Sequence, residues 1–197
     1  MRAATLRDRK LVTDIIAFTF TANPGVNWML RKGGNHERKI RRLASYAFIK
    51  SFVRKGVYIS QNEKGVALCY KFNIKVFSLV ELFHQLRFAL TSISPYRFSA
   101  ILKREAYRNS QRPGSGEYLY FWFLGVMPGG GNAVFEIRDE IFRISREENL
   151  PIYLETAMDR VRIGYERYGF ETFHYWENKD EDIKFWFMKW EPERNVV

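Results

Sequence analysis

The strongest constraint on the fold comes from one apolar segment and the residues that follow it. Tyr118–Val126 is apolar or aromatic at nearly every position, which is typical of a strand covered on both faces. A glycine loop at Met127–Asn132 comes next, and from Ala133 the apolar residues recur at helical spacing. A second strand is expected at Ile152–Leu154. Because strand, helix and strand follow in this order, the sequence predicts two parallel strands joined by a crossover helix, in an α/β fold.

Further helices and strands are expected on both sides of this unit. Thr5 and Asp8 have the spacing of a capping box and predict a first helix, whose pattern ends at Asn23-Pro24-Gly25. The other expected elements are a helix over about Glu37–Arg54, a hairpin of Val57–Ser60 and Val66–Phe72, helices at Leu79–Leu90 and from Phe98, a helix over about Asp159–Tyr168, and an antiparallel pair of Phe170–Trp176 and Ile183–Trp190. Since no linker or internal repeat interrupts them, one domain over residues 1–197 is expected.

Charge and composition narrow the choice of partners. The 32 basic and 22 acidic residues leave a net charge of +10, which favours a polyanionic partner such as nucleic acid, an acidic surface or a phosphorylated cofactor. The single cysteine, Cys69, excludes an intrachain disulfide and a paired-cysteine zinc site, and favours the reducing cytoplasm. No segment has the roughly 18 unbroken apolar residues of a membrane helix, so no membrane partner is expected. The histidines fall in no ligand pattern, so no metal is expected either.

The glycine loop is a candidate anion site. Gly129, Gly130 and Gly131 lie between a buried strand and the first turn of a helix, where free backbone N–H groups and the positive end of the helix dipole converge. Glycines let the backbone approach a phosphate closely, although a purely structural turn also needs them. A dinucleotide fingerprint would need a glycine where Val134 stands, and no Gly-Lys-Ser/Thr of a nucleotide P-loop is present. A diphosphate-bearing cofactor of another kind is therefore the natural ligand.

Two spaced motifs resemble those of the GNAT acyltransferase superfamily. Val126-Met127-Pro128 is similar to the Val-x-Pro that precedes the family's coenzyme A loop, and Gly131-Asn132-Ala133 is similar to the end of that loop. Tyr165-Glu166-Arg167-Tyr168-Gly169-Phe170 is similar to the family's Tyr-Glu-x-x-Gly-Phe at the last helix and following strand. The loop is shorter than the family's, and Pro128 stands where the family has Gln or Arg. The resemblance covers about Tyr118 to Trp190.

The resemblance implies a GNAT-like fold, with a mixed central sheet that splays at the cofactor site and flanking helices. It implies acetyl-CoA as the cofactor, held by the half of the domain at about residues 117–190, with the pantetheine arm lying in the gap between the two strands. The cofactor-binding residues that it implies are Leu124, Val126, Gly129, Gly130, Gly131, Asn132 and Ala133. The implied activity is transfer of the acetyl group to a primary amine by direct attack in a ternary complex.

Two residues are candidates for the proton transfers. Tyr165 resembles the family's tyrosine that points at the coenzyme sulfur, so it is the candidate acid. Glu155, at the end of its strand, is the candidate base acting through water, although a carboxylate there can equally be solvated or cap a helix. The acceptor remains open among a small amine, a peptide N-terminus and a lysine.

Two other functions remain open, as does the oligomeric state. A nucleic-acid-binding protein would use a segment that interleaves aromatic and basic residues, although an amphipathic helix explains the same pattern. The segment comprises Tyr96, Arg97, Phe98, Lys103, Arg104, Tyr107 and Arg108. A GNAT-like protein that binds coenzyme A without turnover is the other alternative, because the loop is shortened. The aromatic last strand around Trp186 leaves a homodimer open.

Overall fold

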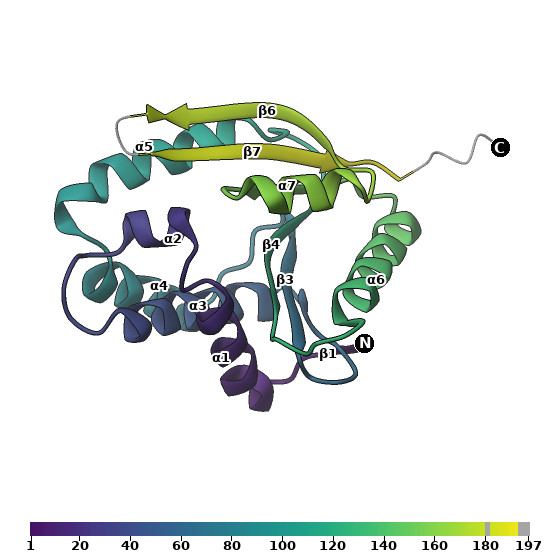
Figure 1. Cartoon of the computed structure of the whole chain (residues 1–197), viewed down its shortest axis with the longest axis horizontal. Coiled ribbons are helices and arrows are strands. Elements are labelled where there is room, and N and C mark those ends of the chain that lie inside the picture. The colour runs from purple at the N-terminus through teal and green to yellow at the C-terminus, as the bar shows by residue number, and fades with distance from the viewer. Residues whose placement is uncertain (180–181, 193–197) are drawn as a thin grey trace.

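The computed structural model describes residues 1–179 and 182–192. Within these residues, seven strands form one mixed sheet in the order β1-β2-β3-β4-β5-β7-β6 (Figure 1). The strands are β1 (Arg2–Ala3), β2 (Val57–Ile59), β3 (Gly65–Phe72), β4 (Tyr118–Val126), β5 (Ile152–Thr156), β6 (Glu171–Asn178) and β7 (Ile183–Trp190). The helices are α1 (Arg9–Thr19), α2 (Pro24–Met29), α3 (His36–Phe52), α4 (Leu79–Ser92), α5 (Phe98–Ser110), α6 (Ala133–Glu148) and α7 (Asp159–Glu166), with 3-10 turns η1 (Leu6–Asp8) and η2 (Pro95–Arg97).

The predicted parallel unit is present, and its two strands diverge. Leu119 of β4 pairs with Ile152 of β5, and Tyr120 pairs with Tyr153. Beyond these two pairs β4 continues as far as Val126, but in the described residues it forms no further pair with β5. On its other side β5 pairs along its whole length with β7. The sheet therefore opens toward the C-terminal ends of β4 and β5, as the predicted splay requires.

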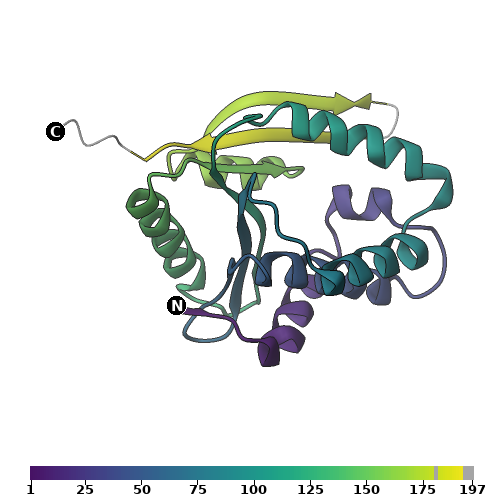
Figure 2. The same ribbon diagram turned by 180° about the vertical axis from the view of Figure 1, so that it is seen from behind.

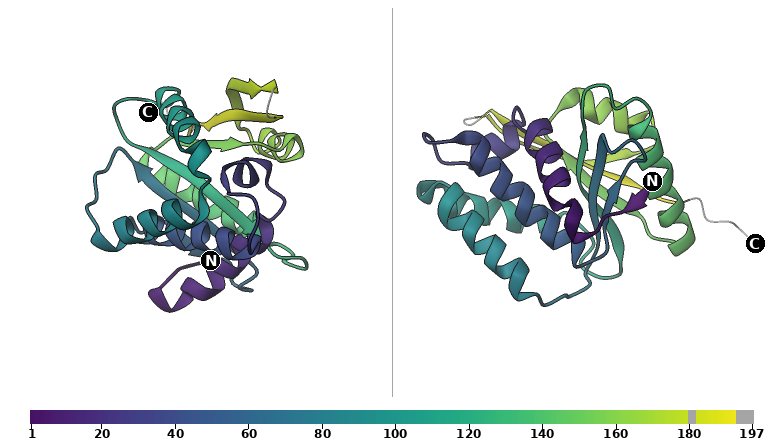
Figure 3. Two further views of the ribbon diagram at one scale, coloured as in Figure 1. Left: turned by 90° about the vertical axis from the view of Figure 1, so that its left-hand side faces the viewer. Right: turned by 90° about the horizontal axis from the view of Figure 1, so that it is seen from below.

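Helices cover the two faces of the sheet unequally. Leu68 of β3 points into a core that contains Ile16 of α1 and Phe48 of α3. Its neighbour Ala67 points the other way, into a core with Ile137 of α6, because successive side chains of a strand alternate between faces. Helices α1 to α5 thus lie on one face, and α6 and α7 lie on the other, as Figures 2 and 3 show.

The N-terminal segment contains one helix more than its sequence predicts. The capping box is confirmed, since the Thr5 amide donates to Asp8 Oδ2 at 2.7 Å. The expectation that Asn23-Pro24-Gly25 only ends a helix is wrong, because these residues also begin α2. The Asn23 side chain accepts a hydrogen bond from the Val26 amide at 3.0 Å, and proline is well suited to the first helical position.

Helix α4 does not bury the apolar stripe that predicts it. Its core-facing side chains are His84, Phe88 and Ser92, whereas the stripe points to solvent. The exposed members are Leu79, Leu82, Phe83, Leu86 and Leu90. No helix of the described chain has the length and apolarity needed to traverse a bilayer.

Candidate active site

Backbone geometry requires all three glycines of the loop between β4 and α6. Gly129 and Gly131 have φ of 71° and 55°, a region that side chains with a Cβ rarely adopt. A Cβ on Gly130 would lie 2.5 Å from Val126 Cγ1. The loop therefore turns tightly against the end of β4 and directs the chain into α6.

The outer side of this loop is open to a ligand. A Cβ on Gly131 would meet no atom within 4 Å. Asn132 occupies the N-cap position of α6, yet its side chain caps none of the helix amides. The first amides of a helix have no partner within the helix. In α6 the Ala133 amide donates to the Gly130 carbonyl, so the amides that follow it are the ones available to an anion. The positive end of the helix dipole favours negative charge at the same place.

Two residues that sequence reasoning assigned only to a hairpin turn lie beside the glycine loop. Lys64 Nζ donates to the Gly129 carbonyl at 3.3 Å, and Asn62 Nδ2 donates to the Gly130 carbonyl at 2.8 Å. The register of β3 against β4 brings them there, because Gly65 pairs with Val126. Lys64 thus adds a positive charge at the mouth of the loop. Only the strand pairing could have indicated this contact.

An apolar cavity lies between β4, α6 and α7, on the α6 side of the sheet. It has a volume of about 30 Å³, and the predicted cofactor residue Leu124 lies in its wall. Arg138 of α6 also lines it and stacks over Tyr168, with the guanidinium carbon 4.9 Å from the ring centroid. In the described residues, the C-terminal part of β4, as far as Val126, forms no strand pair on the side that faces β5. Backbone donors and acceptors on such an edge need partners, so an extended ligand arm fits here.

The predicted acid, Tyr165, lines the same cavity. Its ring lies edge-on to Phe170, with centroids 5.2 Å apart, and to Phe121 at 6.4 Å. Burial raises the pKa of Tyr165 above its ordinary value, so the hydroxyl keeps its proton at neutral pH. Among the described residues no hydrogen-bond partner is seen for this hydroxyl. Gly169, with φ of 86°, ends the α7 segment, as the motif predicts.

The predicted base, Glu155, lies in a buried network of charges at the point where β4 and β5 diverge. One carboxylate oxygen accepts from Tyr120 Oη and Arg108 Nη2, each at 2.5 Å. The other accepts from Arg112 Nη2 at 2.6 Å. The side chains of Glu155 and Arg112 are each 4% exposed. Arg108 belongs to α5, and Arg112 lies two residues beyond its end.

This environment argues against Glu155 as a base. Burial alone would raise the pKa of Glu155, but the guanidinium groups of Arg108 and Arg112 hold it down at about 2. A carboxylate with so low a pKa is a poor proton acceptor at neutral pH. Both of its oxygens are also occupied by donors. The geometry points instead to a structural ion cluster, which sequence reasoning missed because it depends on α5.

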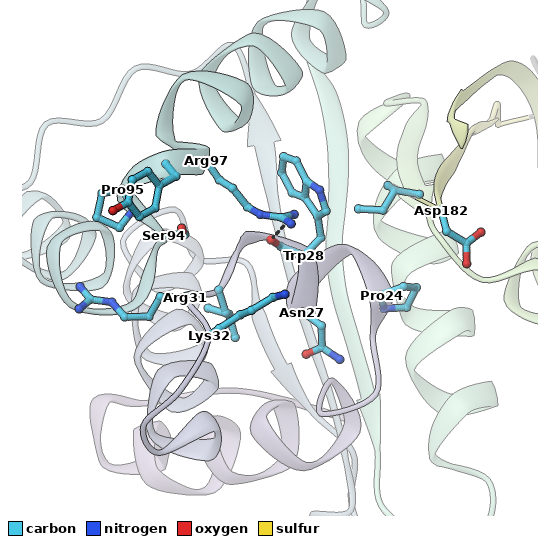
Figure 4. Close-up of a pocket in the computed structure, with 12 residues that line it drawn as sticks. Pro24, Asn27, Trp28, Arg31, Lys32, Ser94, Pro95, Arg97 and Asp182 are labelled. Carbon is cyan, nitrogen blue, oxygen red and sulfur yellow. Dashed lines mark hydrogen bonds between the residues drawn. The ribbon is translucent and has the colours of Figure 1, made fainter. Parts of the chain in front are cut away.

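A larger cavity lies on the opposite face of the sheet, between α2, η2 and the start of β7 (Figure 4). Its volume is about 670 Å³. Arg31, Lys32 and Arg97 line one side, and Asp182 lies across from them (Figure 4). Helix α2 packs closely on β7 beside this cavity, since a Cβ on Gly25 would lie 3.2 Å from the Phe185 ring. This cavity shares no lining residue with the apolar cavity beside Tyr165.

The aromatic and basic segment at residues 96–108 does not form one stacking surface. Tyr96 is 98% exposed, but Arg104 turns inward and lies 4.3 Å from the Trp28 ring centroid. Arg108 is held by Glu155, and Tyr107 Oη hydrogen-bonds His174 Nε2 at 2.6 Å. The segment is thus an amphipathic helix packed against the sheet.

No protein-family profile and no curated protein sequence matches the chain. Solved structures do match it along nearly its whole length. The Corynebacterium glutamicum "histone acetyltransferase HPA2 and related acetyltransferase" has a TM-score of 0.63 and 18% identity, covering 100% of this chain and 97% of its own. Arylalkylamine N-acetyltransferase 2 from Aedes aegypti has a TM-score of 0.65 and 12% identity, covering 96% and 97%.

A third match comes from the C-terminal condensation domain of Ebony, solved in complex with β-alanyl-dopamine. Its TM-score is 0.64 at 16% identity, with 95% of this chain and 96% of that chain covered. Identities this low carry information about the fold and not about the substrate. Together with the divergence of β4 from β5, these similarities show that the chain has the GNAT acyltransferase fold.

Proposed function

We propose that residues 1–197 form one domain that transfers an acetyl group from acetyl-CoA to a primary amine. The observation that carries this proposal is the combination of an open glycine loop, an uncapped N-terminus of α6 and an adjoining unpaired edge of β4. The first two suit a diphosphate, and the third suits an extended arm with amide groups. The residues present therefore fit coenzyme A.

The cofactor contacts are proposed residue by residue. The diphosphate would be bound by the backbone of Gly129, Gly130, Gly131, Asn132 and Ala133. Only those backbone groups that do not already form a hydrogen bond within the turn would contribute. The Gly130 and Ala133 amides already donate to Met127 and Gly130 carbonyls, so the Gly129, Gly131 and Asn132 amides are the stronger candidates. Leu124 and Val126 would bind the arm along β4. Lys64 would balance the phosphate charge.

Tyr165 is proposed as the proton donor. Acetyl-CoA, when bound, would supply an activated thioester, and the departing sulfur would then need a proton. Tyr165 lines the cavity beside Leu124, and its raised pKa keeps the hydroxyl protonated. Its hydroxyl also has no competing partner in the described chain. Glu155 is not carried into this mechanism, because its carboxylate is committed to two arginines.

The acceptor amine is proposed to enter from the opposite face, through the cavity between α2 and η2. The coenzyme groove faces α6 and α7, whereas this cavity lies on the α2 side, so an acceptor held there would have to reach the thioester through the gap between β4 and β5. Holding both reactants on two faces of one opening suits direct transfer in a ternary complex. The cavity, at about 670 Å³, has room for a small amine or the end of a peptide.

Calorimetric titration with coenzyme A tests the cofactor site. We expect Lys64→Glu to weaken binding about tenfold or more, because it replaces a favourable charge at the diphosphate with a repulsive one. Lys103→Glu is the matched control, since it makes the same charge change at an exposed position of α5. Absence of binding by the wild-type protein would refute the proposed function. Equal loss in both variants would remove Lys64 from the site.

Thioester consumption over a panel of amines separates an enzyme from a protein that only binds the cofactor. The panel should contain small amines, peptides with a free N-terminus and peptides with an internal lysine. Consumption that depends on one class identifies the acceptor. Tight binding of coenzyme A with no consumption for any class would favour the catalytically degenerate alternative.

A further inference from the structure

A second large cavity lies between α1, α3 and α4 and shares no lining residue with the glycine loop. Its volume is about 540 Å³. Its wall contains seven cationic side chains and one carboxylate, that of Asp14. The cationic residues are Arg7, Arg9, Lys10, Arg38, Arg41, Arg42 and Arg87. Much of the net charge of +10 is thus concentrated around one hollow.

Most of these cations have no counter-ion in the described part of the chain. Asp14 is shared by Lys10 and Arg41, and Glu37 also pairs with Arg41. The other five arginines make no ion pair with a described carboxylate. These five arginines come from η1 and three different helices, and they lie on both sides of the cavity. Proximity in the sequence alone therefore does not explain why they cluster.

Polar groups in the wall are also without partners. Thr13 Oγ1 and Arg42 Nε are buried from solvent and have no hydrogen-bond partner among the described residues. Burial and the neighbouring charges of Arg38 and Arg87 lower the pKa of Arg42. His84, which is 8% exposed, lies with its Nε2 3.2 Å from Arg9 Nη2. Unpaired donors and like charges at close range destabilise a fold unless something compensates them.

The lining restricts the chemistry of a compensating ligand. Guanidinium groups bind phosphate oxygens through paired hydrogen bonds. Leu6 is the apolar residue of the wall, and no Phe, Tyr or Trp lines the cavity. A single-stranded nucleic acid needs such rings for base stacking and a track of charge rather than one hollow. The concave shape and clustered charge suit a compact ligand with several phosphate groups.

We infer that this cavity, which we call the basic cavity, binds a small polyphosphate at a site separate from the proposed coenzyme site. The ligand would bridge Arg38 and Arg42 of α3 with Arg87 of α4 and Arg9 of α1. Helices α1, α3 and α4 lie on the same face of the sheet, so the ligand would join them on the side that faces solvent. This inference does not depend on catalysis and goes beyond the proposed function.

Isothermal titration with inorganic tripolyphosphate tests the inference. The test variant is Arg38→Gln/Arg87→Gln, which removes two guanidinium groups that have no partner in the described chain. We expect its affinity for tripolyphosphate to fall at least tenfold, while its affinity for coenzyme A stays unchanged. Arg143→Gln is the matched control, because Arg143 is an exposed arginine of α6. Lys64→Glu should show the opposite pattern, with coenzyme A binding lost and tripolyphosphate binding kept.

Thermal denaturation supplies a second readout. Without ligand, the double variant should be at least as stable as the wild type, because two like charges are removed and no ion pair is broken. With tripolyphosphate, the melting temperature of the wild type should rise and that of the double variant should not.

Three results would overturn the inference. The first is no tripolyphosphate binding by the wild type, and the second is equal binding by the double variant. The third is binding only to single-stranded RNA or to vesicles of phosphatidylcholine and phosphatidylserine, with none to tripolyphosphate. Since the coenzyme A titration is read separately, failure here leaves the proposed acetyltransferase standing.

Discussion

Replacing Glu155 by glutamine should destabilise the protein rather than act primarily on its chemistry. The carboxylate is 4% exposed and bonds Arg108 at 2.5 Å and Arg112 at 2.6 Å. Its pKa of about 2 lies below the ordinary 4.5, and a shift of this size corresponds to about 3 kcal/mol. Removing one partner from a buried ion pair costs about 3–5 kcal/mol on general grounds. Both estimates therefore give a loss of about 3 kcal/mol or more in the free energy of unfolding.

Urea and thermal denaturation at pH 7 measure this loss. For a domain of this size, about 3 kcal/mol lowers the melting temperature by about 6–12 °C. Glu147→Gln is the control, because Glu147 is 59% exposed and pairs with Arg143 at the surface. Such an exposed pair contributes less than about 1 kcal/mol.

The pH dependence gives an independent check with a defined sign. The pKa of Glu155 is lowered in the folded state, so its contribution is complete above pH 4.5 and is lost as the pH falls toward 2. The stability difference between wild type and Glu155→Gln should therefore narrow over that window. A melting temperature for Glu155→Gln within 2 °C of wild type at pH 7 would refute the reasoning. A full-stability variant with lost turnover would return Glu155 to the catalytic site.

Four further predictions concern single residues. Tyr165→Phe should slow turnover on the order of ten- to a thousandfold with little change in coenzyme A affinity, and unchanged turnover would remove Tyr165 from the mechanism. Cys69 is 0% exposed and burial raises the pKa of its thiol, so a thiol reagent should react with it only after unfolding, as absorbance titration with and without guanidinium chloride can show. Gly125→Val should destabilise by about 1–3 kcal/mol, because even its Cβ would lie 2.8 Å from Thr19 Oγ1. Gly164→Ala, in open space within α7, should instead stabilise by about 0.5–1 kcal/mol in the same denaturation assay.

The sequence predicts those parts of the fold whose causes are local. The strand Tyr118–Val126 has the predicted bounds, because an unbroken apolar run identifies a buried strand directly. Gly169 and Asn149 also end their helical segments in the left-handed region, as residue type suggests. The two-residue strand at Arg2–Ala3 was not predicted, since it exists only through its pairing with β2.

The candidate site could be predicted only where its residues belong to a continuous sequence motif. The glycine loop and Tyr165 lie on motifs that can be read along the sequence. Lys64 reaches the loop through the register of β3 on β4. Glu155 receives its arginine partners from the end of α5 and the turn after it, more than 40 residues earlier in the chain. No periodicity of α5 says which strand it will cover. Contacts of this kind depend on topology, and they decide whether a carboxylate is a base or half of an ion pair.

The position of the Glu155 network gives the long connection between β3 and β4 a structural role. These strands are antiparallel neighbours, yet α4 and α5 lie between them in the chain. Helix α5 and the turn after it bring Arg108 and Arg112 to Tyr120, the last β4 residue that pairs with β5. The same arginines reach Glu155, which lies just beyond the β5 partner of Tyr120. The cluster therefore lies where the pairing of β4 with β5 ends in the described residues. The connection thus places a buried ion cluster beside the point where the two strands separate, and beside the opening in which the two substrates are proposed to meet.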